Sequence, residues 1–396
     1  MNLLTSISRL FLSLLIFVLV VLTGCSRRSS PEDAELALEA MLSRTVARDK
    51  GVRNAVLLVD SPKLGINGSW AAGIAYEGDD TAMTVQTPFL SASVGKLFTS
   101  SLVLSMVEEG VLSLDDSIVD WLNPSLITDL PAEGGEASLD EITVRRLLTH
   151  RSGLPDYFEG RAADGAPNIF ELITEAPERR WTPRLVLEYT KEHYEPAGKP
   201  GEVFLYADTN YDLLGFIVEA ATGKPFQKVM TEQIFQSLNL GNTWMHAFSD
   251  TPYADAWIED FNAAGTPALT LEVAGGGLAT TVDDLRTFMR SLLDGQPVPL
   301  ESFQAEWRED AMARGIDYGY GMWRIRPGGL FFLLNSYPEM LGVSGSTGSF
   351  LYWVSEYDAI ITGSFNQTGY QRKHISFLIK VLGVLRQAAA FKGSLN

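Results

Sequence analysis

Strand-like segments lie at both ends of this 396-residue chain, with helix-like segments between them, and this order limits the available folds. Near the start, strand-like runs at 53–62 and 68–78 are separated by turn residues. Strand patterns return at 318–327, 330–337, 349–357 and 358–367, before a final helix at 373–390. We therefore predict an α/β (α+β) fold, in which an antiparallel sheet from both chain ends is flanked by helices and an inserted lobe is mainly helical. The run DAIITGSF is apolar on both sides, so helices should cover both sheet faces.

The first 33 residues are expected to lie outside this fold. A short segment carrying Arg9 precedes the apolar run FLSLLIFVLVV, which is shorter than the ~20 residues that span a bilayer. The next residues, LTGC, match a bacterial lipobox that ends at Cys25. We predict a lipoprotein signal peptide at 1–24, lipidation of Cys25, and a polar tether at 25–33. The alternative is a signal anchor with an incidental cysteine.

A lipid on Cys25 would anchor the protein in the bacterial cell envelope, outside the cytoplasm, on the outer membrane or the outer face of the inner membrane. Cys25 is the single cysteine, so no intrachain disulfide is expected. Residues 34–396 are predicted to form one domain and to act as a monomer, with the sheet at about 50–92 and 316–396 and the helical lobe at about 97–310. The formal net charge of −18 argues against nucleic acid as a partner.

Ser93 and Lys96 lie three residues apart at the start of a predicted helix over 93–110. Positions i and i+3 share a helix face, so Lys96 can reach the Ser93 oxygen. A serine becomes a nucleophile when a neighbouring group takes its proton, and a lysine can help to do this. Taken alone, S-x-x-K is a weak signal, and a capping serine followed by a surface lysine is the competing interpretation.

Two further clusters strengthen the functional interpretation. Tyr206 and Asp208 are predicted on a loop before a helix that starts near Asn210, and small residues around Gly345 precede an aromatic strand. In this order the three clusters resemble the serine β-lactamase and penicillin-binding-protein superfamily. The similarity is greatest to β-lactamase-related serine hydrolases, a group with class C β-lactamases, D-aminopeptidases and family VIII-type esterases. Stretches such as FLSASVGKLFTS, ITVRRLLTHRSGLPDY and GGGLATTVDDLRTFM match that group from about residue 50 to 370.

The resemblance implies a β-lactamase/transpeptidase-like fold and a role for each motif residue. Ser93 would form an acyl-enzyme, and Lys96 and Tyr206 would share the proton transfers. The backbone N–H groups of Ser93 and Ser346 would form the oxyanion hole, next to Gly345. The partner would be a small-molecule or peptide-like acyl substrate, and neither a metal nor an organic cofactor is implied.

Two residues depart from the family pattern. Asp208 stands where an asparagine is usual, and a carboxylate there favours the ammonium form of Lys96, which shifts the base role towards Tyr206. Val343 stands where the family has Lys, His or Trp, so a donor for a substrate carboxylate is lost. This argues against penicillins and D-Ala-D-Ala ends and favours neutral esters, amides or lactones, unless another basic residue, such as an arginine, covers the role.

Other residues receive structural interpretations. His150 is expected to be structural, because Lys96 and Tyr206 already fill the base role. The glycines at 275–277 are expected to form a tight turn that lines the cleft before a helix from Thr281. Three histidines lack the spacing of metal ligands: His193, His246 and His374. Three tryptophans either line the pocket or pack in the core: Trp244, Trp257 and Trp323.

The sequence therefore predicts an exported, lipid-anchored serine hydrolase. One alternative is a D,D-peptidase or β-lactamase that acts on cell-wall peptides or antibiotics. The other is a non-catalytic envelope binding module, an interpretation that Asp208 and Val343 keep open.

Overall fold

A nine-stranded sheet forms the larger layer of the structure, a computed structural model that describes residues 28–271, 273–370 and 373–394. The predicted signal peptide and Cys25 lie outside these residues. The end of the predicted tether at 25–33 was wrongly placed outside the fold, because Ser30 caps a helix that begins at Pro31. The strand order is β3-β2-β1-β14-β13-β12-β11-β10-β9, and neighbouring strands are antiparallel. The strands are β1 (Asn54–Ser61), β2 (Ile66–Tyr76), β3 (Thr81–Ala82), β9 (Arg308–Ala313), β10 (Ile316–Tyr318), β11 (Trp323–Ile325), β12 (Met340–Ser344), β13 (Phe350–Val354) and β14 (Ala359–Ser364).

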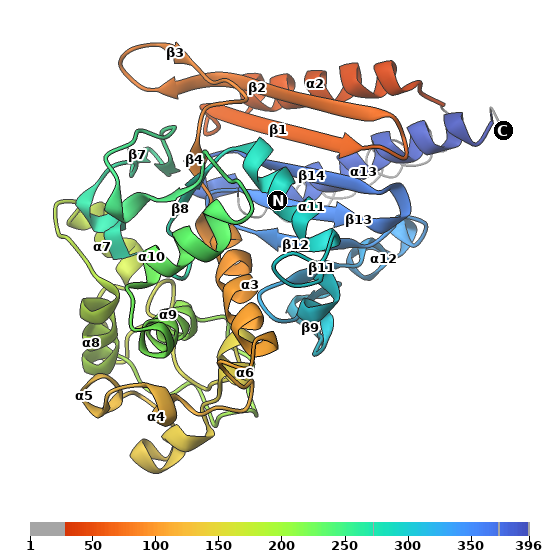
Figure 1. The fold of residues 1–396 in the computed structure, drawn as a ribbon. Helices are drawn as coiled ribbons and strands as arrows, with labels where there is room; N and C mark the ends of the chain where they lie inside the picture. Colours follow the sequence, from red (N-terminus) through yellow and green to blue (C-terminus); the bar gives the residue numbers. More distant parts are fainter. Residues whose placement is uncertain (1–27, 272, 371–372, 395–396) are drawn as a thin grey trace, which may run out of the picture.

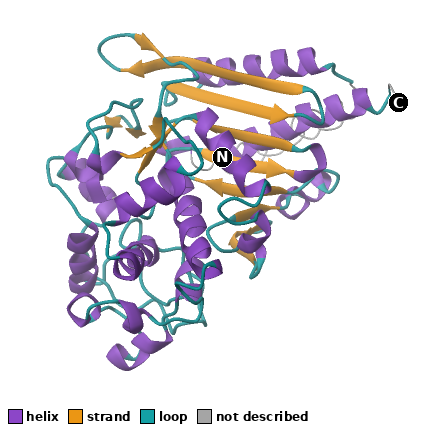
Figure 2. Cartoon of the chain, in the orientation of Figure 1, coloured by secondary structure: helices purple, strands orange, loops and turns teal. Residues whose placement is uncertain are grey.

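Strands β1 and β14 join the two ends of the chain, with Val56 opposite Ser364. The predicted antiparallel sheet from both chain ends is therefore confirmed (Figure 1). The mainly helical lobe lies between them in sequence and beside the sheet in space (Figure 2). The helices are α2 (Pro31–Arg48), α3 (Gly95–Glu108), α4 (Ile118–Trp121), α5 (Pro124–Ile127), α6 (Val144–Leu148), α7 (Ile169–Glu175), α8 (Pro183–His193), α9 (Asp208–Thr222), α10 (Phe226–Met230), α11 (Val282–Leu293), α12 (Pro327–Leu330) and α13 (Lys373–Lys392).

Both faces of the sheet are covered, as its two-sided apolar strands require. Along β14, Ile360 faces the core between the sheet and the helical lobe, whereas Ile361 faces a second core under α2 and α13. By length and composition alone, α13 would be long and apolar enough to cross a membrane. Its apolar residues, such as Leu378 and Leu382, are instead buried in this second core, which accounts for its hydrophobicity.

Three features of the second strand group differ from the prediction. The run 318–327, expected as one strand, holds the end of β10, a turn and β11, which pairs back onto β10. Residues 330–337 were expected to form a strand, but this segment holds the end of α12 and a 3₁₀ turn at Phe332–Leu334. Pro327 opens α12 at its first position, where proline favours a helical turn. The run also lacks alternation, since Leu334 is buried and Phe332 is 66% exposed. Strand β9 was missed, because its exposed, charged residues are typical of a sheet edge rather than a core strand.

A small sheet connects the lobe to the main sheet. It contains β4 (Phe89–Leu90), β8 (Leu278–Thr280) and β5 (Trp244–Met245), and a two-stranded sheet of β6 (Trp257–Ile258) and β7 (Phe261–Asn262) lies nearby. Because β4 leads directly into the Ser93 segment and β8 follows the glycines at 275–277, their pairing places these two segments side by side.

Candidate active site

Ser93 lies on a strained turn rather than inside a helix. It occupies a 3₁₀ turn at Ala92–Val94, which continues into α3. Ala92 has a φ of 46°, a left-handed conformation that costs a non-glycine residue of order 1–3 kcal/mol. The surroundings hold this conformation, and Ser93 contributes to the lining of two adjacent pockets. Backbone strain of this kind often accompanies a side chain that must be presented to a ligand.

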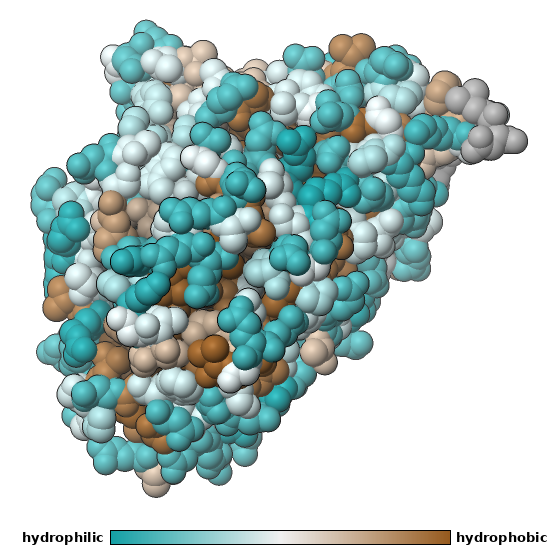
Figure 3. All heavy atoms as spheres, in the orientation of Figure 1, coloured by the Kyte–Doolittle hydropathy of each residue, from teal (hydrophilic) through white to brown (hydrophobic). Residues whose placement is uncertain are grey.

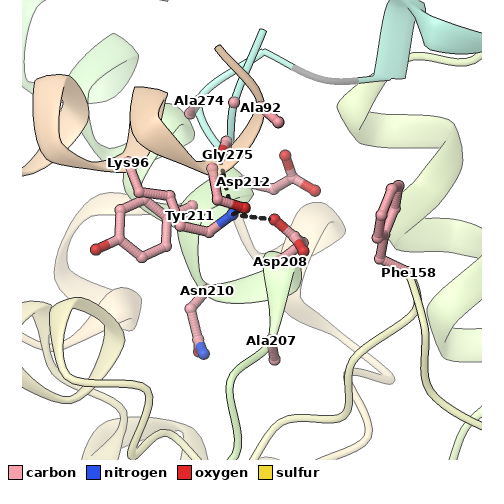
Figure 4. Close-up of polar contacts among 12 residues, drawn as sticks. Ala92, Lys96, Phe158, Ala207, Asp208, Asn210, Tyr211, Asp212, Ala274 and Gly275 are labelled. Carbon is pink, nitrogen blue, oxygen red and sulfur yellow. Dashed lines mark hydrogen bonds and ion pairs between the residues drawn. The ribbon is translucent and has the colours of Figure 1, made fainter. Parts of the chain in front are cut away.

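Lys96 is fully buried behind Ser93 and has three oxygen partners. Its Nζ forms an ion pair with Asp208 and donates to the Gly275 carbonyl oxygen at 2.8 Å and to Ser93 Oγ at 3.4 Å. Figure 4 shows the first two contacts, with Phe158 across from Asp208. As an ammonium group, Lys96 donates its N–H bonds to these oxygens. Lys96 in this state can donate to Ser93 but cannot take its proton.

Tyr206 lies beside this pair. Its hydroxyl oxygen is buried, and burial raises the pKa of Tyr206 above its ordinary value, although Lys96 and Ser93 are close enough to lower it in part. Neither neighbour makes a hydrogen bond of ordinary geometry to the hydroxyl. The Lys96 ammonium also lies 5.1 Å from the centre of the ring. Tyr206 is therefore a neutral phenol in the resting site, suited to give a proton to a leaving group.

Asp208 is the first residue of α9 and not, as predicted, part of the loop before it. Ala207 occupies the capping position and offers no side-chain acceptor. The Asp208 side chain therefore lies at the positive end of the α9 dipole, where it pairs with Lys96.

His150 holds the Tyr206 loop in place. Its Nδ1 accepts hydrogen bonds from the Ala207 backbone N–H at 3.2 Å and from the Asn210 side-chain amide at 2.9 Å. Its ring also packs on the Tyr206 ring, with the centres 4.3 Å apart. Burial and the Lys96 charge hold the pKa of His150 well below its usual range. A neutral ring that accepts through Nδ1 and packs on Tyr206 fits the predicted structural role, although its buried Nε2 has no hydrogen-bond partner among the described residues.

Asp156 is a site residue that the sequence analysis did not single out. Its carboxylate accepts backbone N–H groups of Phe158, Glu159 and Asp208, at 2.8–3.2 Å. Burial and the nearby negative charge of Asp208 raise the pKa of Asp156 to about 6. The sequence carried a weak signal, because Asp156 belongs to the quoted stretch SGLPDY, but its spacing does not reveal that it faces Asp208.

Close backbone approach brings the third motif to Ser93. A Cβ on Gly345 would lie 2.7 Å from the Ser91 carbonyl oxygen and 3.0 Å from the Ala92 Cβ, so only glycine fits. Ser349 Oγ donates a hydrogen bond to the Ser91 carbonyl oxygen at 2.6 Å, which stabilises the contact between the two turns. Ser346 thereby lines the same two pockets as Ser93, as an oxyanion-hole donor requires.

Val343 is the predicted substrate-binding residue that the structure keeps out of the pockets. It pairs with Leu351, and both side chains lie in the core between the sheet and the helical lobe. The next residue, Ser344, lines the pocket that contains Tyr206, but its hydroxyl bonds to His374 Nε2 at 2.6 Å and the Tyr352 hydroxyl at 2.7 Å. The motif therefore presents no cation to this pocket.

The glycine turn at 275–277 does line the cleft, as predicted, and Gly275 adds the acceptor for Lys96. The three tryptophans have different environments. Trp257 and Trp323 line pockets, whereas Trp244 packs in a small core around β8. His246 lines a pocket, and burial lowers its pKa to about 4, whereas His193 lies elsewhere and pairs with Asp164. Among the described residues, no group of His, Cys, Asp and Glu is arranged to hold a metal ion.

Two pockets meet at Ser93. The first, of about 60 Å³, is mostly apolar, and Leu90, Phe158, Phe170, Ile173, Ile258 and Leu269 form much of its wall. The second, of about 200 Å³, contains Tyr206 together with the carboxyl groups of Asp156, Glu159 and Asp208. Among the described residues that line the second pocket there is no lysine or arginine. The site thus has one apolar side and one acidic side.

Comparison with known proteins agrees with this geometry. A family model described as Beta-lactamase matches residues 46–379. The chain is 28% identical over 173 residues to penicillin-binding protein 4 from Amycolatopsis lactamdurans, a match that covers 43% of this chain and 39% of that protein. The chain spans about half or less of several of the curated relatives it matches.

Solved structures match over more of the chain. The D-stereospecific amidohydrolase from a Streptomyces species has a TM-score of 0.66 at 25% identity, covering 84% of this chain and 94% of that one. The D-amino acid amidase from Ochrobactrum anthropi SV3 has a TM-score of 0.70 at 22% identity, covering 92% and 100%, which shows the same fold.

Proposed function

This chain belongs to the Beta-lactamase family. We propose that it is a serine hydrolase that cleaves esters or amides whose leaving group carries no carboxylate. The observation that carries the proposal is the acidic pocket beside Ser93, which Asp156 and Glu159 line together with Asp208, the last of these being paired with Lys96.

The reaction divides into two acyl transfers. Ser93 Oγ forms a bond to the acyl carbon, the bond to the leaving oxygen or nitrogen breaks, and the Ser93 proton passes through Tyr206 to the leaving group. Water then attacks the acyl-enzyme, releases the acid and returns a proton to Ser93. Backbone N–H groups at Ser93 and Ser346 stabilise the oxyanion in both steps, and removal of one such donor costs about 3 kcal/mol. Lys96 stays an ammonium and stabilises negative charge on Ser93 and Tyr206.

The two pockets are assigned from the position of Tyr206. A general acid must reach the heteroatom that leaves, so the leaving group occupies the pocket that contains Tyr206. The apolar pocket contains Ser93 and Ser346 but not Tyr206, so it lies on the acyl side.

A carboxylate on the leaving group would enter an unfavourable pocket. It would meet the carboxyl groups of Asp156 and Glu159 without a lysine or arginine among the described lining residues. A charged group buried without a donor costs about 1–3 kcal/mol or more. This supports an amidase or esterase over a D,D-peptidase or β-lactamase, although several curated relatives carry penicillin-binding or carboxypeptidase names.

The test compares two aryl acetates that differ in one group: the leaving phenol carries either a methyl ester or the free carboxylate. After correction for their hydroxide reaction rates, kcat/KM should be about tenfold to hundredfold higher for the methyl ester, since 1.4 kcal/mol is a factor of ten. Asp156→Asn should reduce the difference in kcat/KM between the two esters. Glu136→Gln, at an exposed position outside the pockets, should leave this difference unchanged. Ser93→Ala supplies the inactive reference.

Three results would count against this proposal. If the wild type prefers the carboxylate ester, another cation serves the pocket and the cell-wall or antibiotic function moves ahead. A stable mass increase with a penicillin would point the same way. If neither a fluorophosphonate nor a penicillin adds mass to Ser93, the binding module becomes the better interpretation.

We also propose that the enzyme works outside the cytoplasm on a lipid anchor at Cys25. The motivating feature is LTGC directly after the apolar run FLSLLIFVLVV. Cys25→Ser should either release the protein from membranes or leave the precursor uncleaved, because the lipid chains supply the membrane affinity. Ser26→Ala, one residue later, is the matched control. Membrane retention and processing equal to wild type in Cys25→Ser would reject the anchor.

A further inference from the structure

We propose that the apolar pocket restricts the acyl group of the substrate to short aliphatic chains, and that the Phe170 ring sets this limit. This inference rests on the proposed function, because it needs an acyl-enzyme at Ser93. It goes further by naming the acyl half of the substrate and the side chain that selects it.

The pocket chemistry excludes a charged acyl group. Helix α7 contributes Phe170 and Ile173, and the segment around β6 and β7 contributes Ile258 and Leu269. The titratable side chains in the lining are His246, which burial keeps neutral at neutral pH, and Asp208, which is paired with Lys96. An apolar group that enters this pocket gains about 0.8 kcal/mol for each methylene it buries.

The size of the pocket limits the chain length. An apolar cavity of about 150 Å³ holds a benzene ring, or six carbons. By that scale, the roughly 60 Å³ available here accommodates about two or three carbons beyond the carbonyl. Propionyl and butyryl groups fit this space, whereas a benzoyl or octanoyl group does not.

Phe170 separates this small pocket from a larger space. Its partly buried ring lines both the apolar pocket and an outer cavity of about 740 Å³. Three other residues line both spaces as well: Ile258, Ser346 and Thr368. Phe170 has the largest of these four side chains. The ring is held by an edge-to-face contact with Phe158, with the centres 5.6 Å apart. Phe158 itself lines both pockets at Ser93. Removing the Phe170 ring should open the inner pocket into the outer space.

The test uses p-nitrophenyl esters of two, four, six and eight carbons, whose leaving group has no carboxylate. In the wild type, kcat/KM should peak at the butyrate and fall at least tenfold by the octanoate. Phe170→Ala should raise the octanoate-to-butyrate ratio of kcat/KM at least tenfold. This size is expected because a missing or extra methylene in an apolar pocket changes specificity by about 10–200-fold. Ala263→Leu, which fills the pocket, should shift the optimum to the acetate.

Phe332→Ala is the matched control, because that ring is 66% exposed and lies outside both pockets. Fluorophosphonate labelling of Ser93 is measured on every variant, so that a variant that fails to fold is recognised. If labelled wild type prefers the octanoate, or if both pocket variants keep the wild-type ratio, the acyl-pocket proposal is wrong and the proposed function stands. If the wild type itself is not labelled, the proposed function fails first.

Discussion

At the scale of single residues, Asp156 makes the site sensitive to pH. The ordinary pKa of an aspartate is about 3.9, and in the folded protein it is raised to about 6. A folded-state pKa above the unfolded value means that the folded state binds the proton more tightly. Ionisation of Asp156 therefore lowers the free energy of unfolding as the pH rises from about 4 to about 6, by at most about 3 kcal/mol.

Asp156→Asn should remove this pH-dependent loss. Its lost backbone hydrogen bonds lower stability equally at every pH, but the stability of the variant relative to wild type should rise between pH 4 and pH 6 and stay level above about pH 7. Urea unfolding at pH 4, 5, 6 and 7 measures this difference. A difference that is constant across the range would mean that Asp156 ionises with its ordinary pKa.

The role of Asp156 could not be predicted from the sequence. The order and spacing of Ser93, Lys96 and Tyr206 indicated that they lie together, and the structure places them side by side. Asp156 could not be placed in this way, because its importance arises from an approach to Asp208 that spans 52 residues. The Gly275 carbonyl could not be assigned to Lys96 either, since any residue type supplies a backbone oxygen.

At the scale of elements, the predictions held where a pattern was periodic or two-sided. The apolar strands β1 and β14 were predicted because both of their faces are buried. The segment 330–337 was wrongly predicted as a strand because a short apolar run does not distinguish a strand from helical turns. Asp208 was placed on a loop because helix boundaries depend on capping, and Ala207 is an uncharacteristic cap.

The approach of the β12–β13 turn to the Ser93 turn leads to a second prediction. Gly345→Ala would place a Cβ 2.7 Å from the Ser91 carbonyl oxygen, so the turn that carries Ser346 must move. We expect a loss of about 1–3 kcal/mol in stability and at least a hundredfold fall in kcat/KM, because the oxyanion hole opens. Both quantities are measured on the purified variant.

Gly241→Ala is the control for that change, since a Cβ there has no neighbour within 4 Å. It should leave activity and stability close to wild type. Normal turnover by Gly345→Ala would place the second oxyanion donor on a residue other than Ser346.

At the scale of the whole molecule, negative charge extends from the site to the surface. The full chain has a formal net charge of −18, and removal of residues 1–24, which carry Arg9 and no acid, would bring it to −18 − 1 = −19. On the face in Figure 3, hydrophilic residues predominate and apolar residues form small patches. The outer cavity at the cleft adds Glu159, Glu171, Glu259 and Asp260, so the entrance carries the same sign as the surface.

This charge predicts that salt changes selectivity in a definite direction. Field lines concentrate in a cleft of one sign, and the Debye length falls from about 30 Å at 0.01 M salt to about 3 Å at 1 M. Between these concentrations, kcat/KM for the carboxylate aryl acetate should rise several-fold, while the methyl ester should change little. The difference in kcat/KM between the two esters should become smaller but persist. The reason is that salt screens the carboxyl groups of Asp156 and Glu159 within the pocket less than it screens the surface charges. A difference that is the same at both salt concentrations would assign the whole selectivity to the pocket, and one that vanishes at 1 M would assign it to the surface.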